Sequence, residues 1–232
     1  MWMDEINTSE IKAAKTIFTG YESLQEKAKI VFVKPVEEGV VLVFVQTPFY
    51  ARGGGQIADL GTIDQHQVIE VRNWDGFYLH LVDTKKPYQI GEQLDLIVDF
   101  EKRQNISILH SLAHVYWGEI ERLLDTKFDQ TYELITHDDA TLEMVSTEEK
   151  FITPEILEEA IKIVDHDIKL SVPTSIYFEN NDLDKRVVTW NGISKDYCGG
   201  THVKNTSELK SVVILKFKKK AGKHRIKFTF EQ

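Results

Sequence analysis

The hydrophobic pattern of the chain changes its period near residue 98, and this change constrains the fold more than any other feature. Before it, short β-branched runs alternate with turn formers, and the clearest runs are Lys29–Lys34 and Val40–Gln46. After it, apolar residues recur at helical spacing over Glu101–Asp125. The sequence therefore predicts a strand-rich N-terminal part, followed by a part that opens with a long helix.

Further strands are expected in the first hundred residues, and a short amphipathic helix is expected before them at Glu10–Phe18. The other strand candidates are Gly61–Arg72, Phe77–Asp83 and Gln93–Phe100. Five or so short strands without intervening helices favour a small barrel or sandwich. We therefore predict a β-barrel-like domain at residues 1–97 that carries a glycine-rich motif.

The C-terminal part combines helices and strands. A second helix is expected to begin with Thr153 as its N-cap and Pro154 at its first position. Strand-like segments follow at Val172–Phe178, Arg186–Trp190, Ser211–Phe217 and Arg225–Phe230. We predict an α+β domain at residues 98–232, and we assign the whole chain to the α+β class.

Composition narrows the class of protein. The 232 residues are 42% hydrophobic, which excludes a disordered tail, a collagen-like repeat and a coiled coil. Cys198 is the single cysteine, so no internal disulfide points to secretion. No apolar run approaches the roughly 20 residues of a membrane helix. These features predict a soluble, monomeric, cytoplasmic protein without a membrane partner.

The charge is unevenly distributed along the chain. The net charge of −9 argues at first against a nucleic-acid partner, but residues 205–232 hold eight Lys and Arg against two acidic residues. A local basic segment of this kind is suited to a phosphate backbone. The other interpretation is a lysine-rich edge strand that resists aggregation. The nucleic-acid-binding candidates in this segment are Lys218, Lys219, Lys220, Lys223 and Arg225.

Two short motifs offer metal ligands. His110 and His114 lie four residues apart on the long predicted helix, so both project from one face. Cys198 and His202 flank two glycines and a threonine. Each motif alone has an ordinary explanation, namely a chance HxxxH or a buried inert cysteine. Together they supply the four ligands of a tetrahedral zinc ion, so we expect Zn²⁺ as a cofactor.

A third motif, Ala51–Gln56, reads ARGGGQ. Gly53, Gly54 and Gly55 leave backbone N–H groups uncovered, which allows a ligand to approach closely. The motif lacks the lysine and hydroxyl residue of a phosphate-binding loop. The alternative is a glycine bulge at a barrel corner.

The three motifs together resemble the alanyl-tRNA editing family. The segments that carry the resemblance are TPFYARGGGQIADLG (47–61), HSLAH (110–114) and CGGTHV (198–203). They stand in the family order, and the similarity extends from about residue 16. The chain is similar to free-standing editing proteins of the longer type, and to the editing domain of alanyl-tRNA synthetase without its aminoacylation core.

The resemblance implies hydrolysis of the ester that joins serine or glycine wrongly to tRNA(Ala). It assigns the zinc ligands His110, His114, Cys198 and His202. Near the editing pocket it places the glycines and Gln56, which would contact substrate and assist catalysis. Further catalytic candidates are Thr201 and Thr131, the second by spacing alone. Arg52 departs from the family pattern, which commonly has an acidic or small residue there, and is a candidate phosphate contact.

Three alternatives stay open. A non-catalytic, zinc-stabilised tRNA-binding module would carry the same motifs. Editing of another tRNA, such as the threonyl one, fits CGGTH less well. Within the editing interpretation, four protein ligands are typical of structural zinc, whereas a catalytic site keeps a position open. Zinc therefore either activates water or shapes the pocket.

Overall fold

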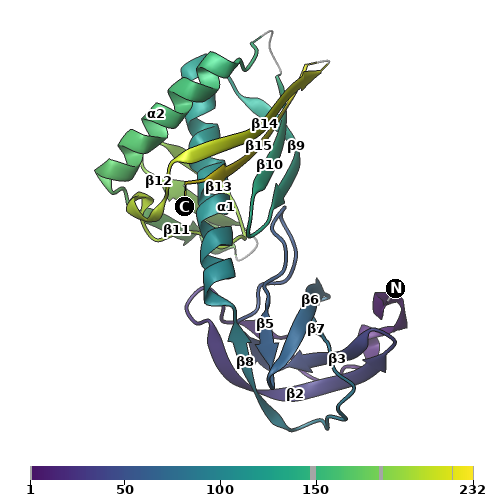
Figure 1. Ribbon diagram of the computed structural model, residues 1–232. Helices are drawn as coiled ribbons and strands as arrows, with labels where there is room; N and C mark the ends of the chain where they lie inside the picture. Colours follow the sequence, from purple (N-terminus) through teal and green to yellow (C-terminus); the bar gives the residue numbers. More distant parts are fainter. Residues whose placement is uncertain (1, 147–149, 183–184, 221, 232) are drawn as a thin grey trace. The chain divides into compact units, whose positions relative to one another are not determined.

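The computed structural model describes residues 2–146, 150–182, 185–220 and 222–231 (Figure 1). Its contacts divide the chain into two compact units. The N-terminal unit comprises residues 1–53 and 57–103, and the C-terminal unit comprises residues 54–56 and 104–232. Both α and β elements are present, strands dominate, and two α-helices occur in the described ranges. Neither of these helices is long and apolar enough to cross a membrane.

Six strands of the N-terminal unit close into a barrel in the order β2-β3-β7-β6-β5-β8. Their bounds are β2 Gln25–Val36, β3 Gly39–Phe44, β5 Gly61–Ile63, β6 His66–Trp74, β7 Phe77–Val82 and β8 Gln93–Val98. A short parallel pair joins β1 (Ile17–Phe18) to β4 (Gln46–Thr47). Strand β8 alternates exposed and buried residues, as expected for a strand that packs one face on a core.

Strand β3 is buried on both faces, which explains its continuous run of apolar residues. Val40, Leu42 and Phe44 belong to one core cluster. Val41 and Val43 belong to a second core cluster. Apolar residues of the segment 2–11 contribute to this cluster from outside the barrel wall. A strand covered on both sides has no face left for polar residues.

The helix expected at Glu10–Phe18 is wrong. The chain forms two short 3₁₀ turns, Trp2–Glu5 and Thr8–Glu10, and then runs extended into β1. The apolar residues Trp2, Ile6 and Ile11 pack on the barrel wall, and the Ile17 amide donates to the carbonyl of Val45. The apolar spacing therefore reflects tertiary packing, while the backbone hydrogen bonds go to the barrel.

The single strand expected at Gly61–Arg72 is also wrong, because a tight turn divides it into β5 and β6. Asp64 and Gln65 both adopt positive φ, at 50° and 69°. Two successive residues with positive φ form the turn that suits a β-hairpin. The turn contains no glycine, so its sequence signal is weak.

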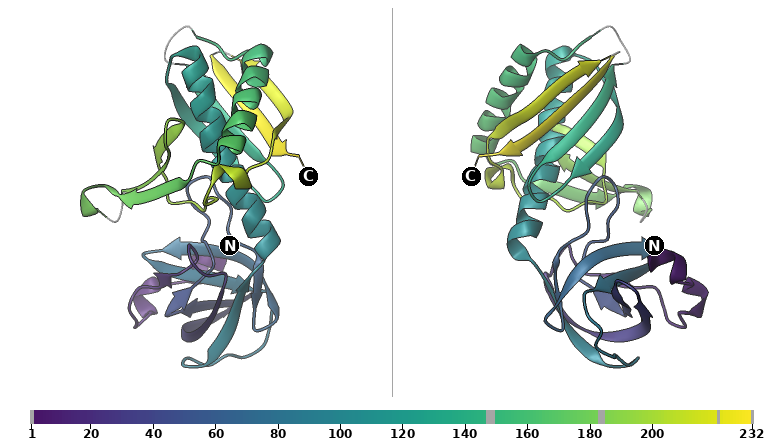
Figure 2. Two further views of the ribbon diagram at one scale, coloured as in Figure 1. Left: turned by 90° about the vertical axis from the view of Figure 1, so that its left-hand side faces the viewer. Right: turned by 45° about the vertical axis from the view of Figure 1, so that its right-hand side comes forward.

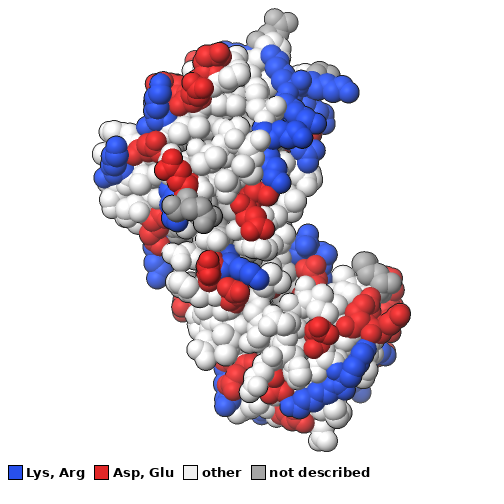
Figure 3. Space-filling model, in the orientation of Figure 1, with Lys and Arg blue, Asp and Glu red and all other residues white. Residues whose placement is uncertain are grey.

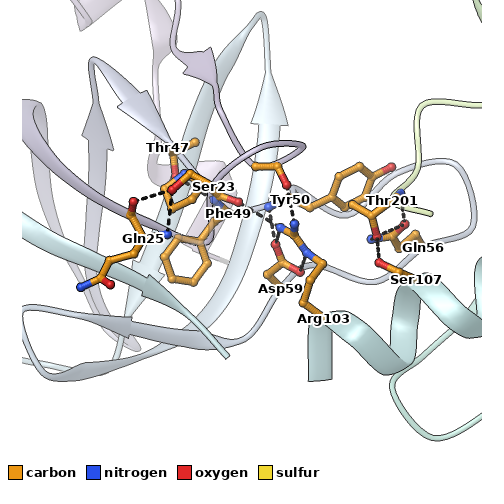
Figure 4. Close-up of polar contacts among 12 residues, drawn as sticks. Ser23, Gln25, Thr47, Phe49, Tyr50, Gln56, Asp59, Arg103, Ser107 and Thr201 are labelled. Atoms are coloured by element: carbon orange, nitrogen blue, oxygen red, sulfur yellow. Dashed lines mark hydrogen bonds and ion pairs between the residues drawn. The ribbon is translucent and has the colours of Figure 1, made fainter. Parts of the chain in front are cut away.

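A buried ion pair organises the loops of the N-terminal unit (Figure 4). Arg103 donates from Nε to Oδ1 of Asp59 at 2.7 Å, and it also reaches the carbonyls of Gly20 and Pro48. The second oxygen of Asp59 accepts from the Tyr50 amide at 2.6 Å. Each buried charge thus has hydrogen-bonded partners, although burial outweighs them and raises the pKa of the Asp59 carboxyl.

The C-terminal unit packs two helices on one face of a four-stranded antiparallel sheet (Figure 2). The helices are α1 (Phe100–Leu124) and α2 (Pro154–Leu170). The sheet has the order β14-β15-β10-β9, with bounds β9 Phe128–Ile135, β10 Ala140–Ser146, β14 Val212–Lys220 and β15 Lys223–Phe230. A smaller sheet contains β11 Thr174–Phe178, β12 Arg186–Trp190 and β13 Ser194–Tyr197.

The start predicted for the second helix is confirmed. The Thr153 hydroxyl accepts from the Ile156 amide, and Pro154 occupies the first helical position. The hairpin β9–β10 was not foreseen from the sequence. Residues 129–132 of β9 are all exposed, so this strand lacks the alternation that reveals a half-buried strand.

We expect His80 to make folding sensitive to acid. The ring is fully buried in the N-terminal unit, and its Nε2 pairs with the Thr47 hydroxyl at 2.8 Å. Burial lowers the pKa of His80 to about 4, in spite of its bonds to the backbone at Leu42 and Tyr78. The unfolded chain therefore binds the proton first, and stability is lost as the pH falls from about 6.5 towards 4.

The shift corresponds to about 3 kcal/mol at most. Denaturant unfolding of wild type between pH 7 and pH 4 measures the loss. His80→Gln should reduce this loss, whereas His66→Gln, at a half-buried position of β6, should not. Equal acid sensitivity of wild type and His80→Gln would contradict the prediction.

Candidate metal centre

Four potential metal ligands converge within the C-terminal unit. His110 and His114 project from one face of α1, one helical turn apart. Cys198 and His202 lie in the loop that follows β13. The ligand atoms of these four residues all lie within 4.8 Å of one another. The structure thus brings together all four residues that the two motifs predicted as metal ligands.

The thiol of Cys198 is at the centre of the group. Its Sγ lies 3.4 Å from Nε2 of His110 and 3.2 Å from Nε2 of His202. The Gly200 amide donates to the same sulfur at 3.3 Å. Arg186 holds the turn around the thiol, because its guanidinium donates to the carbonyls of Cys198 and Gly200.

Each imidazole is oriented through its other ring nitrogen. Nδ1 of His110 lies 2.9 Å from Oε1 of Gln56, Nδ1 of His114 lies 3.0 Å from Oδ2 of Asp196, and Nδ1 of His202 lies 3.2 Å from Oγ of Ser111. Partners of this kind fix the tautomer and direct Nε2 towards a metal ion.

The residues present fit a metal ion. Among the described residues, Nε2 of His114 is buried and has no hydrogen-bond partner. An orphaned buried nitrogen is unfavourable unless something binds it. One thiol and three imidazoles are also the donor set that zinc accepts. The group can therefore hold a metal ion.

The electrostatics favour the metal-binding forms of Cys198 and His202, whereas the pKa of His114 rises to about 10 because its contacts with Asp196 and Cys198 outweigh the opposite effect of burial. Burial alone would raise the pKa of Cys198, but contacts with His110, His114 and His202 outweigh it and hold the pKa far below its ordinary value. Burial, together with the charge of His110, lowers the pKa of His202 to about 3. A thiolate and a neutral imidazole are the forms that bind metals.

The Gln56 side chain forms several hydrogen bonds beside this group (Figure 4). It is 1% exposed, and its Oε1 accepts from His110 and from the Thr201 amide at 2.9 Å. Its Nε2 donates to the Thr201 hydroxyl at 3.1 Å, which also accepts from Ser107 at 2.9 Å. Gln56 and Thr201 thus lie where they position His110, and their catalytic roles stay predictions.

The glycine-rich segment reaches Gln56 through a close backbone approach. Gly55 has φ of 78°, a conformation that favours glycine. Its carbonyl accepts from the Ile135 amide at 2.9 Å, and Gln56 forms a parallel bridge with the same residue of β9. A Cβ on Gly55 would lie 2.6 Å from the Glu133 side chain. The glycine is therefore needed for the loop to lie against β9.

A cavity of about 580 Å³ opens beside the group. His114, Cys198 and Gly54 line it, together with Thr131 and Glu133 from β9. The Thr131 hydroxyl donates to Oε1 of Glu143 at 2.9 Å. Thr131 therefore lines the cavity beside the metal group, and its catalytic role stays a prediction. The volume is in the range of small-molecule sites.

Two residues of the glycine-rich motif belong to the N-terminal unit. Arg52 pairs with Glu70 of β6 at 3.5 Å, and its backbone amide donates to Val71. The carbonyl of Gly53 accepts from the Tyr50 hydroxyl at 3.2 Å. A phosphate contact of Arg52 and a substrate contact of Gly53 stay predictions.

Cationic side chains gather on the outer face of β14 and β15 (Figure 3). Three cross-strand pairs match cation with cation: Lys216 with Lys227, Lys218 with Arg225, and Lys220 with Lys223. Alternation along each strand places all six on one face, here called the cationic face. Lys219 lies on the other face, where its Nζ is 3.7 Å from the centre of the Phe151 ring.

Sequence reasoning missed the residues that orient the imidazoles and one that lines the cavity. Ser111 lies inside the HSLAH motif, and Asp196 precedes Cys198 by two residues, so a search for acceptors beside the ligands would have found both. Glu133 carries no local signal. Burial raises the pKa of its carboxyl, although the nearby His110 and His114 act in the opposite direction.

Comparisons with known proteins agree with the three motifs. Residues 186–227 match the family of the threonyl and alanyl tRNA synthetase second additional domain, and residues 3–102 match tRNA synthetases class II (A). The alanine–tRNA ligase of Pseudothermotoga lettingae is 29% identical over 88% of this chain, and that of Campylobacter jejuni is 28% identical over 88%. The ligase of Acholeplasma laidlawii is 31% identical over 85%.

The chain spans about a quarter of the length of these relatives: 26%, 27% and 24% in the same order. The matches make it a relative of class II aminoacyl-tRNA synthetases. More narrowly, it is a protein like the editing domain of alanyl-tRNA synthetase, as the sequence resemblance predicted.

Adding a single methyl group at Gly200 should test whether the metal centre depends on the close packing around His110. A Cβ on Gly200 would overlap the His110 ring and approach Oε1 of Gln56 to 3.0 Å, whereas a Cβ on Gly199 would meet nothing within 4 Å. We expect Gly200→Ala to weaken metal binding by about tenfold or more, because it displaces a ligand and its orienting partner.

Gly199→Ala, one residue away, is the matched control and should bind metal as wild type does. Competition with a chromophoric chelator measures both affinities. Equal affinities of the two variants would show that the crowding around His110 is unimportant for binding.

Proposed function

We propose that the protein is a zinc-dependent hydrolase that deacylates tRNA(Ala) carrying serine or glycine, and that it acts in trans. The observation that carries the proposal is the His110–His114–Cys198–His202 group, oriented by buried partners and open to a cavity, in a chain related to alanine–tRNA ligases. An aminoacyl ester is already reactive, so such a site has only to position a water, polarise the carbonyl and select the amino acid.

Zinc in this group would act as a Lewis acid, lower the pKa of a bound water, or hold the substrate. The protein's own residues supply the rest. Gln56, Asp196 and Ser111 hold the imidazoles in one tautomer, and Gly200 allows the Cys198 turn to approach His110. Small cavity-lining residues such as Gly54 leave room for the aminoacyl end.

The cationic face is the proposed contact with the tRNA backbone. Cations directly opposite one another repel, so three such pairs destabilise the hairpin unless anions neutralise them. Glu143 lies 3.1 Å from Lys223 and 3.8 Å from Arg225, and Asp139 lies 2.8 Å from Lys227. No described carboxylate forms an ion pair with Lys218 or Lys220, which leaves both available to phosphates.

The first test is deacylation of tRNA(Ala) esterified with serine, glycine or alanine, in the presence and absence of a chelator. We expect loss of the serine or glycine ester, little loss of the alanine ester, and inhibition by the chelator that added zinc reverses. His114→Ala should reduce the rate by at least a hundredfold, because it removes a metal ligand.

His137→Ala is the matched control, since His137 lies outside the metal group. Binding of tRNA(Ala) without hydrolysis of any ester would identify a zinc-stabilised binding module and reject the hydrolase. A variant that loses zinc yet deacylates at the wild-type rate would exclude any catalytic use of the metal.

If the cationic face binds tRNA, the affinity for tRNA should fall as the salt concentration rises. Replacing Lys216, Lys218 and Lys220 with Ala should lower the slope of log affinity against log salt by about two to three, since each phosphate contact contributes about 0.7–0.9. The control replaces three lysines of the N-terminal unit, Lys12, Lys27 and Lys29, and therefore changes the net charge equally. An unchanged slope in the first variant would remove the cationic face from the interface.

A further inference from the structure

Glu133 places a carboxylate in the cavity that the metal group shares. It lines this cavity together with His114, Cys198 and Gly54, and it is half-buried. In the sheet it is opposite Leu142, whereas its neighbour Tyr132 is opposite Glu143. Because side chains alternate along a strand, Glu133 points away from the cationic face.

The carboxylate is held in place, and His110 and His114 lie near it without forming an ion pair with it. The Gln130 side chain provides a hydrogen bond, and the backbone of Gly55 lies directly against the carboxyl group. Among the described residues, no Lys, Arg or His forms an ion pair with Glu133. Burial of the carboxylate outweighs these two imidazoles, so its position favours a ligand that brings a cation into direct contact.

The metal group is complete without Glu133. The four atoms that lie within 4.8 Å of one another come from His110, His114, Cys198 and His202. Glu133 therefore faces the cavity as a separate polar group. An aminoacyl ester offers two features to such a cavity: a carbonyl that reacts, and an α-ammonium group on the neighbouring carbon, two bonds from the carbonyl carbon.

We propose that Glu133 binds the α-ammonium group of the esterified amino acid, and so positions the ester carbonyl beside the metal group. The inference rests on the proposed hydrolase function and extends it to the substrate class: esters of α-amino acids, as opposed to esters of hydroxy acids or N-blocked amino acids. A charge-assisted hydrogen bond to the carboxylate supplies the selection.

This role differs from that of a general base. A base would assist every ester in the cavity equally, because its proton comes from the attacking water. An ammonium-binding carboxylate assists only those esters that carry the cation. Comparison of two isosteric esters therefore separates the roles.

The experiment uses the full chain with glycyl-tRNA(Ala) and glycolyl-tRNA(Ala), in which a hydroxyl replaces the ammonium group. We expect wild type to prefer the glycyl ester by roughly tenfold to a hundredfold in kcat/KM. Glu133→Gln should bring this ratio close to one. Asp129→Asn, which removes an exposed charge from the same strand, should keep the wild-type ratio.

Binding provides a readout that needs no turnover. Calorimetry with a 3′-glycylamino-adenosine analogue should show tighter binding than with its N-acetylated form, and Glu133→Gln should abolish the difference. Metal content and metal affinity of Glu133→Gln should equal those of wild type.

Each other outcome overturns the inference. An equal fall in the rate for both esters would assign Glu133 to general base catalysis, and loss of metal would make it part of the metal site. A wild-type ratio near one would exclude recognition of the ammonium group while leaving the hydrolase intact. Failure of wild type to hydrolyse any ester would instead reject the proposed function.

Discussion

The buried amide of Gln56 is the interaction on which the metal centre depends. Its oxygen accepts from the His110 ring and the Thr201 backbone, and its nitrogen donates to the Thr201 hydroxyl. One side chain thus joins the glycine-rich loop, helix α1 and the cysteine loop. Because the amide is 1% exposed, water cannot replace any of these partners. The orientation of His110 is therefore set by a residue distant in sequence.

Much of the candidate site could be predicted from sequence because its signals are local. A helix brings residues four apart onto one face. The spacing of His110 and His114 alone therefore indicates that both side chains project in the same direction. Two glycines between Cys198 and His202 indicate a sharp turn at which backbone approaches a ligand. Thr153 and Pro154 likewise mark a helix start by their own conformational preferences.

Features set by distant contacts carried no such signal. The helix expected at Glu10–Phe18 failed because its apolar residues pack on the outside of β3, which no local pattern reveals. Hairpin β9–β10 was not predicted, because four consecutive exposed residues in β9 hide the alternation typical of a strand. Glu133 acquires its role only through tertiary contacts with the cavity.

The place of Gly54–Gln56 in the chain also affects how the protein is made. These residues belong to the C-terminal unit but are flanked on both sides by the N-terminal unit, and Gln56 precedes its partner Thr201 by 145 residues. During synthesis at about 5–20 residues per second, the loop leaves the ribosome several seconds before its partner exists. The bonds between Gln56 and Thr201 can therefore form only after almost the whole chain has been made, so the orientation of His110 is fixed late.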